Sequence, residues 1–238
     1  MMVAGNKLVP LRPTCAGMKF KSHTMLGTLV KISVLASTKM KNAICVAGVD
    51  SNDKWVRPVP KDGLNFQPSQ LVERGRVVVE PFNEVDFVAV RPLANVPQSE
   101  DLEVDAMREP RLIRTLSDSE AGSLLRRLDE HEVVSSHGNR VDSSGSRLEA
   151  FLVSKNRSLI VSRVDHVQGV STSYFAGQGK YRIQFSIGDA NFNLPCTDLK
   201  WRAIVRTTGD KAAAYLTTAR ELHFVIGLTR FFKDRYWK

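Results

Sequence analysis

Short segments typical of β-strands follow one another closely in residues 30–92, and this crowding limits the folds that the chain can adopt. Turn clusters such as SNDK at 51–54 separate the segments. Five strands within about sixty residues suit a small, partly open barrel, because closure removes exposed sheet edges. The expected strands are VKISVLAS from Val30, AICVAGVD from Ala43, WVRPVP from Trp55, GRVVVEPF from Gly75 and VDFVAVRP from Val85.

Two residues within these strands carry a more specific expectation. Gly48 lies inside the second strand, where a missing side chain indicates a bulge or the close approach of another backbone. Pro58 cannot donate a hydrogen bond to a neighbouring strand. The third strand is therefore expected to lie at a sheet edge or to end near this residue.

A helix and a serine-rich loop separate this region from a second series of strands. Ser117 and Glu120 have the spacing of a capping box, and an apolar stripe from Ala121 to Leu128 follows. Residues 135–147 hold five serines and two glycines and are typical of a linker. Beyond them we expect a short helix within 210–220 and strands at LEAFLVS, SLIVSRVDHV, YRIQFSI, NFNLP, KWRAIV and ELHFVIGLTRFF.

These patterns predict a mainly β protein with minor helix, organised as two small barrels joined by a helix and a Ser/Gly-rich loop. We expect residues 30–134 to form the first barrel with its capped helix, 135–147 the linker, and 148–238 the second barrel. Residues 1–29 contain basic side chains and no acidic ones. We expect them to be a disordered tail, or to precede a true start at Met18 or Met25.

The positive charge of the chain is concentrated in its second part. Residues 1–150 hold 20 basic and 19 acidic side chains, whereas residues 151–238 hold 14 and 6. A basic half beside a neutral half favours a polyanionic partner, most often nucleic acid. No apolar run approaches the ~18 residues of a membrane span, so no membrane partner is expected.

Cysteine and histidine usage argues against metal and disulfide chemistry. The three cysteines are far apart and form no C-x-x-C pair, and the five histidines show no metal-ligand spacing. Reduced thiols fit a cytoplasmic location. We therefore expect no metal, no cofactor and no catalytic residues.

Several motifs resemble those of one prokaryotic family. They are AS at 36–37, CVAG at 45–48, KWVRP at 54–58, DLKW at 198–201 and LHFVIGLTRFF at 222–232. In this order they resemble the dual OB-containing domain family over roughly residues 30–235. The resemblance implies two OB-like barrels (oligonucleotide/oligosaccharide-binding folds), nucleic-acid binding, and a setting in bacterial conflict or defence systems. It transfers no catalytic residues.

Basic and aromatic residues mark the candidate binding surface. A base could stack on Trp55 while Arg57 holds a phosphate; alternatively, Trp55 fills the barrel and Arg57 pairs with an acid from a neighbouring strand. Lys180, Arg182 and Gln184 alternate with apolar residues in the segment KYRIQFSI, so they share the outer face of the expected strand. This face could follow a phosphate backbone, or it could simply be solvated. The other candidates are Lys200, Trp201, Arg202 and Arg206, with Trp201 in the core as the alternative, and Lys233 and Arg235 near the C-terminus.

The sequence thus predicts a non-catalytic protein that binds nucleic acid, with single-stranded DNA or RNA favoured because basic and aromatic residues are interleaved. Its role would be that of a sensor or accessory factor. One alternative is a metal-dependent nuclease that uses Asp189, Asp198 and Lys200. Another is a protein–protein adaptor whose basic face meets an acidic partner, encoded nearby.

Overall fold

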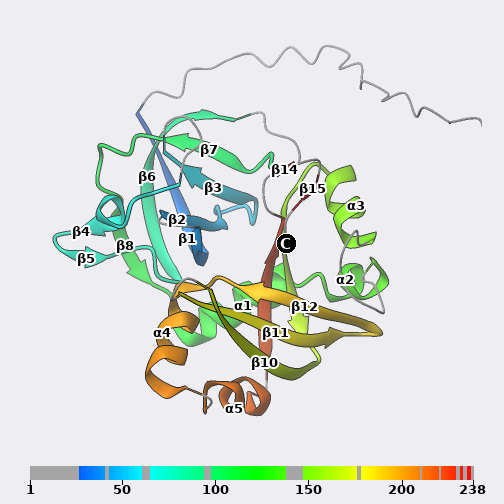
Figure 1. Cartoon of the computed structure of the whole chain (residues 1–238). Coiled ribbons are helices and arrows are strands. Elements are labelled where there is room, and N and C mark those ends of the chain that lie inside the picture. Colours follow the sequence, from blue (N-terminus) through cyan, green and yellow to red (C-terminus); the bar gives the residue numbers. More distant parts are fainter. Residues whose placement is uncertain are drawn as a thin grey trace, which may run out of the picture.

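The computed structural model describes residues 27–40, 43–60, 65–93, 98–137, 147–175, 178–209, 211–219, 221–228, 231–232 and 235–236. These residues are mainly β-structure, as predicted, and they contain five α-helices, whereas the sequence indicated two. Figure 1 shows the strands of the first half at the upper left and the sheet of β10, β11 and β12 below them. Most of the expected N-terminal tail lies outside the described residues, and Thr28 and Leu29 already belong to the first strand.

Five strands of the first half form a closed ring. Each neighbouring pair in the order β1–β2–β3–β7–β6 is hydrogen-bonded, and β6 pairs back onto β1. Within the ring, only the β3–β7 pair is parallel. The ring is thus a small five-stranded barrel. Its strands are β1 (Thr28–Met40), β2 (Ala43–Val49), β3 (Trp55–Val59), β6 (Asn83–Pro92) and β7 (Asp101–Val104).

The barrel closes because β1 is long enough to serve two neighbours. Its first part, up to Ser33, pairs with β6, and its second part pairs with β2 across a register shift between Val34 and Ala36. Gly48 faces this bend. A Cβ there would collide with the backbone carbonyl of Ser33, which confirms the predicted close approach.

The interior of this barrel is apolar, and further short elements surround it. Pairing between β3 and β2 stops at Val56, before Pro58, so Pro58 stands near a strand end as expected. The buried interior residues include Ile32, Val34, Val46, Phe66, Val85 and Phe87. The smaller elements are a 3₁₀ turn at Pro68–Leu71, β4 (Val72–Glu73), β5 (Arg76–Val77) and β8 (Arg111–Thr115), which pairs with β6.

The prediction of a strand over residues 75–82 was wrong. Only Arg76–Val77 is extended in a short ladder, and the fifth strand of the barrel is β7. This strand was missed because it has four residues, two of them acidic. Asp101 and Glu103 are buried in it as partners of Arg57 and Arg91.

Helix α1 (Asp118–Leu128) begins with the predicted capping box. The Glu120 backbone N–H donates to Ser117 Oγ, and the Glu120 carboxylate accepts from the Ser117 backbone N–H at 2.8 Å. Arg114 also hydrogen-bonds this carboxylate. Together with Ser117 it lowers the pKa of Glu120 to about 2.

Among the described residues, the second half repeats part of the strand order of the first, the part that runs from β6 through β1 and β2 to β3. Strands β9 and β10, separated by one residue, together take the place of β1. Strand β9 pairs with β13, and strand β10 pairs with β11. β12 then pairs with β11. Among the described residues no pairing joins β12 to β13, so a second closed barrel stays a prediction. The strands are β9 (Leu159–Val164), β10 (His166–Phe175), β11 (Gln178–Ile187), β12 (Ala190–Cys196) and β13 (Leu222–Gly227).

Helices replace two of the strands that we expected in this half. LEAFLVS lies in α3 (Arg147–Ser154) and KWRAIV in α4 (Leu199–Thr208). In α4, Trp201, Ile204 and Val205 contact the core at helical spacing, and that period outweighs the β-branched content. The predicted short helix within 210–220 is confirmed as α5 (Lys211–Thr218). The remaining elements are α2 (His131–His137), β14 (Phe231–Phe232) and β15 (Arg235–Tyr236).

Each half has its own core, and a third cluster packs the halves together. Leu35 and Val49 of the first barrel, Leu124 of α1 and Val161 of β9 are buried against one another. Val134 of α2 belongs to the core of the second half. The expected linker therefore starts inside α2 and ends inside α3, and residues 138–146 lie outside the described part. The domain boundaries themselves stay a prediction.

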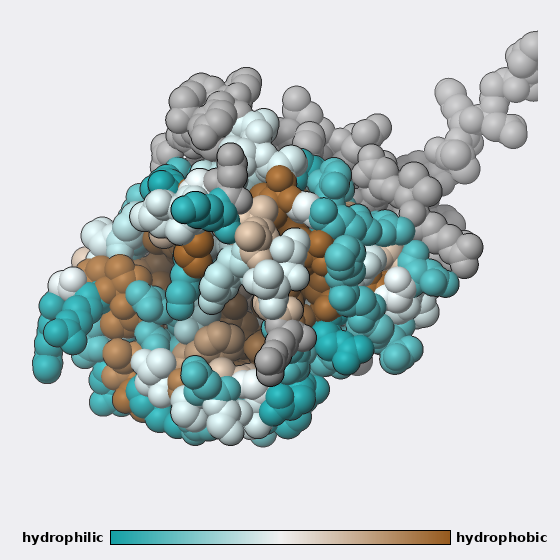
Figure 2. Space-filling view, turned by 90° about the horizontal axis from the view of Figure 1, so that it is seen from below, coloured by the Kyte–Doolittle hydropathy of each residue, from teal (hydrophilic) through white to brown (hydrophobic). Residues whose placement is uncertain are grey.

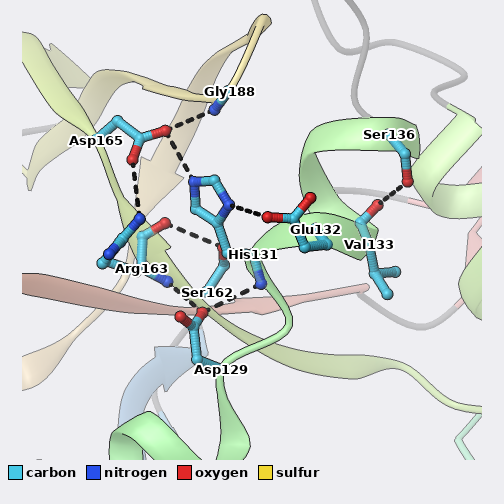
Figure 3. Close-up of polar contacts among 9 residues, drawn as sticks. All are labelled: Asp129, His131, Glu132, Val133, Ser136, Ser162, Arg163, Asp165 and Gly188. Atoms are coloured by element: carbon cyan, nitrogen blue, oxygen red, sulfur yellow. Dashed lines mark hydrogen bonds and ion pairs between the residues drawn. The ribbon is translucent and has the colours of Figure 1, made fainter.

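A polar clasp attaches α2 to the bend between β9 and β10 (Figure 3). Asp165 lies at this bend, 2.8 Å from His131 Nε2, and accepts a hydrogen bond from the Gly188 backbone N–H at 2.6 Å. Partial burial acts to raise the pKa of Asp165, but the two hydrogen bonds, together with the charges of His131 and Arg163, outweigh it and leave the pKa lowered.

The clasp predicts a pH-dependent contribution to stability. Because the folded-state pKa of Asp165 lies below its ordinary value of 3.8, the stabilisation is present above that value and is lost as pH falls through the folded-state pKa. We expect Asp165→Asn to lower the melting temperature at pH 7, with the difference from wild type shrinking below about pH 3.8. Thermal melts from pH 7 to pH 3 measure this. Exposed Glu109→Gln is the control, and a difference that grows on acidification would contradict the assignment.

The buried pair of Arg57 and Asp101 gives a second prediction. Asp101→Ala leaves an unpaired guanidinium in a buried site, which we expect to lower the free energy of unfolding by about 3–5 kcal/mol. Urea denaturation of the full chain measures it. Arg108→Ala, which removes an exposed pair with Asp105 at 3.9 Å, should cost less than about 1 kcal/mol. Equal losses in the two variants would show that the buried pair has no special role.

Candidate nucleic-acid interface

Strand β11 presents a basic face to solvent and an apolar face to the core of the second half. This is the alternation that the sequence predicted, and the packing of the inner residues fixes which side chains point outward. The exposed side chains are those of Lys180, Arg182 and Gln184, and the buried ones those of Tyr181, Ile183 and Phe185.

Arg182 is oriented on this face by the neighbouring strand β12. Its Nε donates to Asn193 Oδ1 at 3.0 Å, and its Nη2 donates to the Asn193 backbone carbonyl. A guanidinium has five N–H donors. Two bonds to Asn193 therefore leave donors that a phosphate oxygen can accept from, on a side chain whose direction is already set.

Helix α4 begins at a carboxylate cap. Asp198 Oδ1 accepts a hydrogen bond from the Trp201 backbone N–H at 2.6 Å. Burial raises the pKa of Asp198, although the hydrogen bonds from the Trp201 and Lys200 backbone N–H groups oppose this. The D-x-x-W motif is thus explained as a helix start, because the aspartate satisfies a backbone donor three residues later.

The basic residues of α4 adjoin the basic strand. Lys200 and Arg206 are exposed. The Arg202 guanidinium lies over the Tyr181 ring, 5.2 Å from its centre, and this cation–π contact ties α4 to β11. Helix α4 begins three residues after Cys196, which pairs with Tyr181, so α4 lies near the start of β11. Tyr181 points to the inner side of the strand, so Arg202 contacts the face opposite Lys180 and Arg182.

The two candidate tryptophans, Trp55 and Trp201, do not offer open stacking surfaces. Trp201 is 7% exposed and packs in the second core, and its Nε1 has no hydrogen-bond partner among the described residues. Trp55 is half-buried against the cluster between the halves. For both residues the core alternative fits the observed packing. The reason is the large apolar area of the indole ring, because burying it contributes more to the free energy of folding than burying a smaller side chain.

Arg57 pairs with an acidic residue of a neighbouring strand, which is the alternative to phosphate binding that the sequence left open. It is 6% exposed, and its Nε donates to Asp101 Oδ1 at 2.5 Å. Burial by itself lowers the pKa of Arg57, but the hydrogen bond and the charge of Asp101 outweigh it, so the pKa is raised and the side chain stays charged. Its charge is matched inside the protein and does not face a ligand.

The two C-terminal candidates remain predictions. Lys233 lies outside the described residues. Arg235 pairs with Phe232 in the short ladder of β14 and β15, which establishes its backbone position only.

The carboxylates of the nuclease alternative lie far apart. Asp189 is in the turn between β11 and β12, whereas Asp198 follows the opposite end of β12. At ~3.3 Å per residue of strand they are separated by roughly 20 Å or more. One metal ion needs oxygen ligands within about 2.6 Å, so these two cannot share it. Across the described ranges, His, Cys, Asp and Glu form no group of three that could hold a metal ion.

The structure also bears on nucleophilic chemistry at Cys196 and on membrane insertion. Burial raises the pKa of the Cys196 thiol to about 11, which keeps it protonated near neutral pH and a poor nucleophile. Within the part of the chain that the structure describes, none of the helices combines the length and apolar character needed to cross a membrane.

A comparison with known protein families identifies an OB-type family, which agrees with the strand order of the first barrel. Residues 30–238 match the model of a family described as the dual OB-containing domain. The chain belongs to this family. No curated protein shows a significant match to it. OB barrels commonly bind oligonucleotides, so membership supports nucleic-acid binding at this general level.

OB barrels bind their ligands on the face of the second and third strands. In the first barrel this face is closed off: Ala47 and Val49, which point away from the barrel interior, are 3% and 1% exposed. The corresponding strands of the second half, by order of pairing, are β11 and β12, whose outward face carries Lys180 and Arg182 in solvent. The two halves therefore differ in whether this face is accessible.

An exposed aromatic residue could not be recognised from the sequence. Tyr215 on α5 is 69% exposed, and α5 packs against α4 and β10. Its helix was predicted, but AAAYL gives no sign of which face is covered. Figure 2 views the molecule from the end that carries α4 and α5, and there hydrophilic side chains dominate while apolar ones form separate patches.

The burial of Trp201 is open to a direct test. Trp201→Leu keeps an apolar side chain in the core and removes both the aromatic ring and an Nε1 group that has no partner among the described residues. We expect the variant to bind oligonucleotides as wild type does, measured by fluorescence anisotropy. Loss of a stacked base, worth ~1–3 kcal/mol, would weaken binding by about five-fold or more. Weakening of that size with an unchanged melting temperature would show that Trp201 contacts the oligonucleotide after all.

Proposed function

We propose that the second half of this protein binds single-stranded nucleic acid along the outward face of β11 and the adjoining basic side of α4. The observation that carries the proposal is the accessible basic face of β11 and β12, set against the buried corresponding face of the first barrel. The first barrel then acts as a scaffold for the second half.

Charge and geometry support a phosphate-tracking surface. Lys180 and Arg182 are two residues apart on one strand face, which spaces them by about 6–7 Å, close to the separation of successive phosphates along an extended strand. Lys200 and Arg206 on α4 extend the positive region. These contacts bind the backbone and carry no sequence information.

A single strand is favoured because an exposed aromatic side chain lies on α5, the helix that packs against α4 and β10. Tyr215 on α5 is exposed and offers its ring to a base, the role that the sequence suggested for Trp201. Bases of a duplex are stacked on each other and cannot use such a ring, whereas bases of a single strand can. DNA and RNA are equal candidates.

The role proposed is binding without chemistry, in a cytoplasmic protein that acts as a sensor or accessory factor. The separation of Asp189 and Asp198 removes the support for the nuclease alternative. A defence setting remains a prediction from the family resemblance. The adaptor alternative, with an acidic protein partner encoded nearby, is the outcome to expect if no oligonucleotide binds.

Salt dependence tests the proposal. We expect 20-nucleotide oligothymidine or oligouridine to bind with an affinity that falls steeply with salt and is insensitive to EDTA, measured by fluorescence anisotropy. Lys180→Ala combined with Arg206→Ala should weaken binding. It should also reduce the slope of log K against log[salt] by ~0.7 for each phosphate that the variant no longer neutralises.

Lys54→Ala is the matched control, because Lys54 is an exposed lysine of the first half. It should leave both the affinity and the slope unchanged. Equal effects of Lys54→Ala and the double variant, or tighter binding of a 20-base-pair duplex than of the single strand, would contradict the proposal.

A further inference from the structure

A pocket lies at the seam between the two halves. Its volume is about 800 Å³, within the range of small-molecule sites. The first half supplies the segment before β6 and one side of α1, and the second half supplies Lys200 of α4 and His223 of β13. Because Lys200 also belongs to the proposed binding surface, the pocket opens beside the expected path of the strand.

One wall of the pocket is an aromatic residue in a strained conformation. Phe82 has a φ of +71°, in the left-handed region that bulky residues rarely adopt. Two backbone hydrogen bonds hold it there: its N–H donates to the Val34 carbonyl at 2.7 Å, and its carbonyl accepts from the Leu116 N–H at 2.8 Å. Such strain in a ligand-sized pocket points to a function for the ring.

The lining of the pocket also includes a glycine that packing does not require. Gly122 lies inside α1, where glycine weakens a helix relative to alanine. A Cβ at this position would meet only the flexible Arg126 guanidinium, at 3.4 Å. Because Gly122 lines the pocket, a side chain much larger than a methyl group would have to displace Arg126 or enter the pocket.

Polar groups around the pocket suit a nucleotide. The exposed carboxylates of Glu80 and Asp118 can accept from the amino and imino N–H groups of a base, and Lys200 can hold its phosphate. His223 also lines the pocket, with its Nε2 4.0 Å from Glu221 Oε1, another lining residue. Its side chain is 4% exposed, and its Nε2 has no hydrogen-bond partner among the described residues.

We infer that this pocket takes one unstacked nucleobase, with its ring against Phe82 and its phosphate at Lys200. The inference rests on the proposed function, since the base is that of a bound single strand; a free nucleotide has the same chemistry and is separated from it by experiment. The pocket would thus add base recognition to a surface that otherwise contacts only the backbone.

The test fills the pocket and leaves its other side chains in place. Gly122→Phe places a ring in the opening, and Gly122→Ala is the matched control that adds only a Cβ. Each protein is titrated with adenosine, guanosine, cytidine and uridine 5′-monophosphates, followed by NMR, with ribose 5-phosphate as a probe without a base. We expect wild type and Gly122→Ala to bind at least one nucleotide and not ribose 5-phosphate, and Gly122→Phe to bind none.

The same three proteins are then titrated with the 20-nucleotide strand. Gly122→Phe should bind it about five-fold or more weakly, the effect of one stacked base, with an unchanged salt slope. Unaltered strand binding by Gly122→Phe overturns the inference and leaves the proposed function intact. Nucleotide binding without strand binding by wild type overturns the proposed function and assigns the pocket to a free nucleotide.

A second variant covers the case in which Gly122→Phe does not fold, as judged by its melting temperature. Phe82→Gly removes the ring and suits the positive φ, which glycine adopts readily. It should lose nucleotide binding and the same share of strand affinity. Retention of both would overturn the inference.

Discussion

The guanidinium of Arg57 and the carboxylate of Asp101 meet on the outward side of the first barrel, yet both are almost fully removed from solvent. Their neighbour Val56 faces the barrel interior, so Arg57 must point the other way. Segments of the second half pack over this region: Ser158 Oγ donates to the Glu100 carboxylate, and Ser99 Oγ donates to the Asn156 carbonyl at 2.5 Å. Charges buried this way require matched partners, because an unpaired one is costly.

Burial of that wall decides where a ligand can bind. The apolar cluster of Val49, Leu124 and Val161 joins the halves beside the ion pair, so the usual ligand face of the first OB barrel becomes an internal contact. The corresponding strands of the second half remain in solvent, where Arg182 is oriented by Asn193. Corresponding strands are thus placed differently in the two halves, inside the protein in the first and in solvent as a basic surface in the second. The seam itself forms the pocket beside Phe82.

The elements that the sequence predicted well are those whose signals are local. The capping box of Ser117, the close approach at Gly48 and the alternation of β11 depend on residues within a few positions of one another. Strand β7 and helix α4 were missed because their state depends on distant partners. Asp101 is tolerated in a strand only because Arg57 lies opposite, and the apolar stripe of α4, which includes Trp201, packs on a core assembled from the whole second half.

The features of the candidate site also fall into those that the sequence predicted and those that depend on tertiary packing. The sequence by itself determined that the chain is rich in strands, that its second half is basic, and that β11 has one charged face, since composition and period-two alternation are properties of the chain alone. Only the tertiary structure decided that Arg57 and Trp201 are internal, that Tyr215 is exposed, and that Phe82, Gly122 and Lys200 surround one pocket. Exposure depends on which surfaces pack together, and that packing joins residues more than a hundred positions apart.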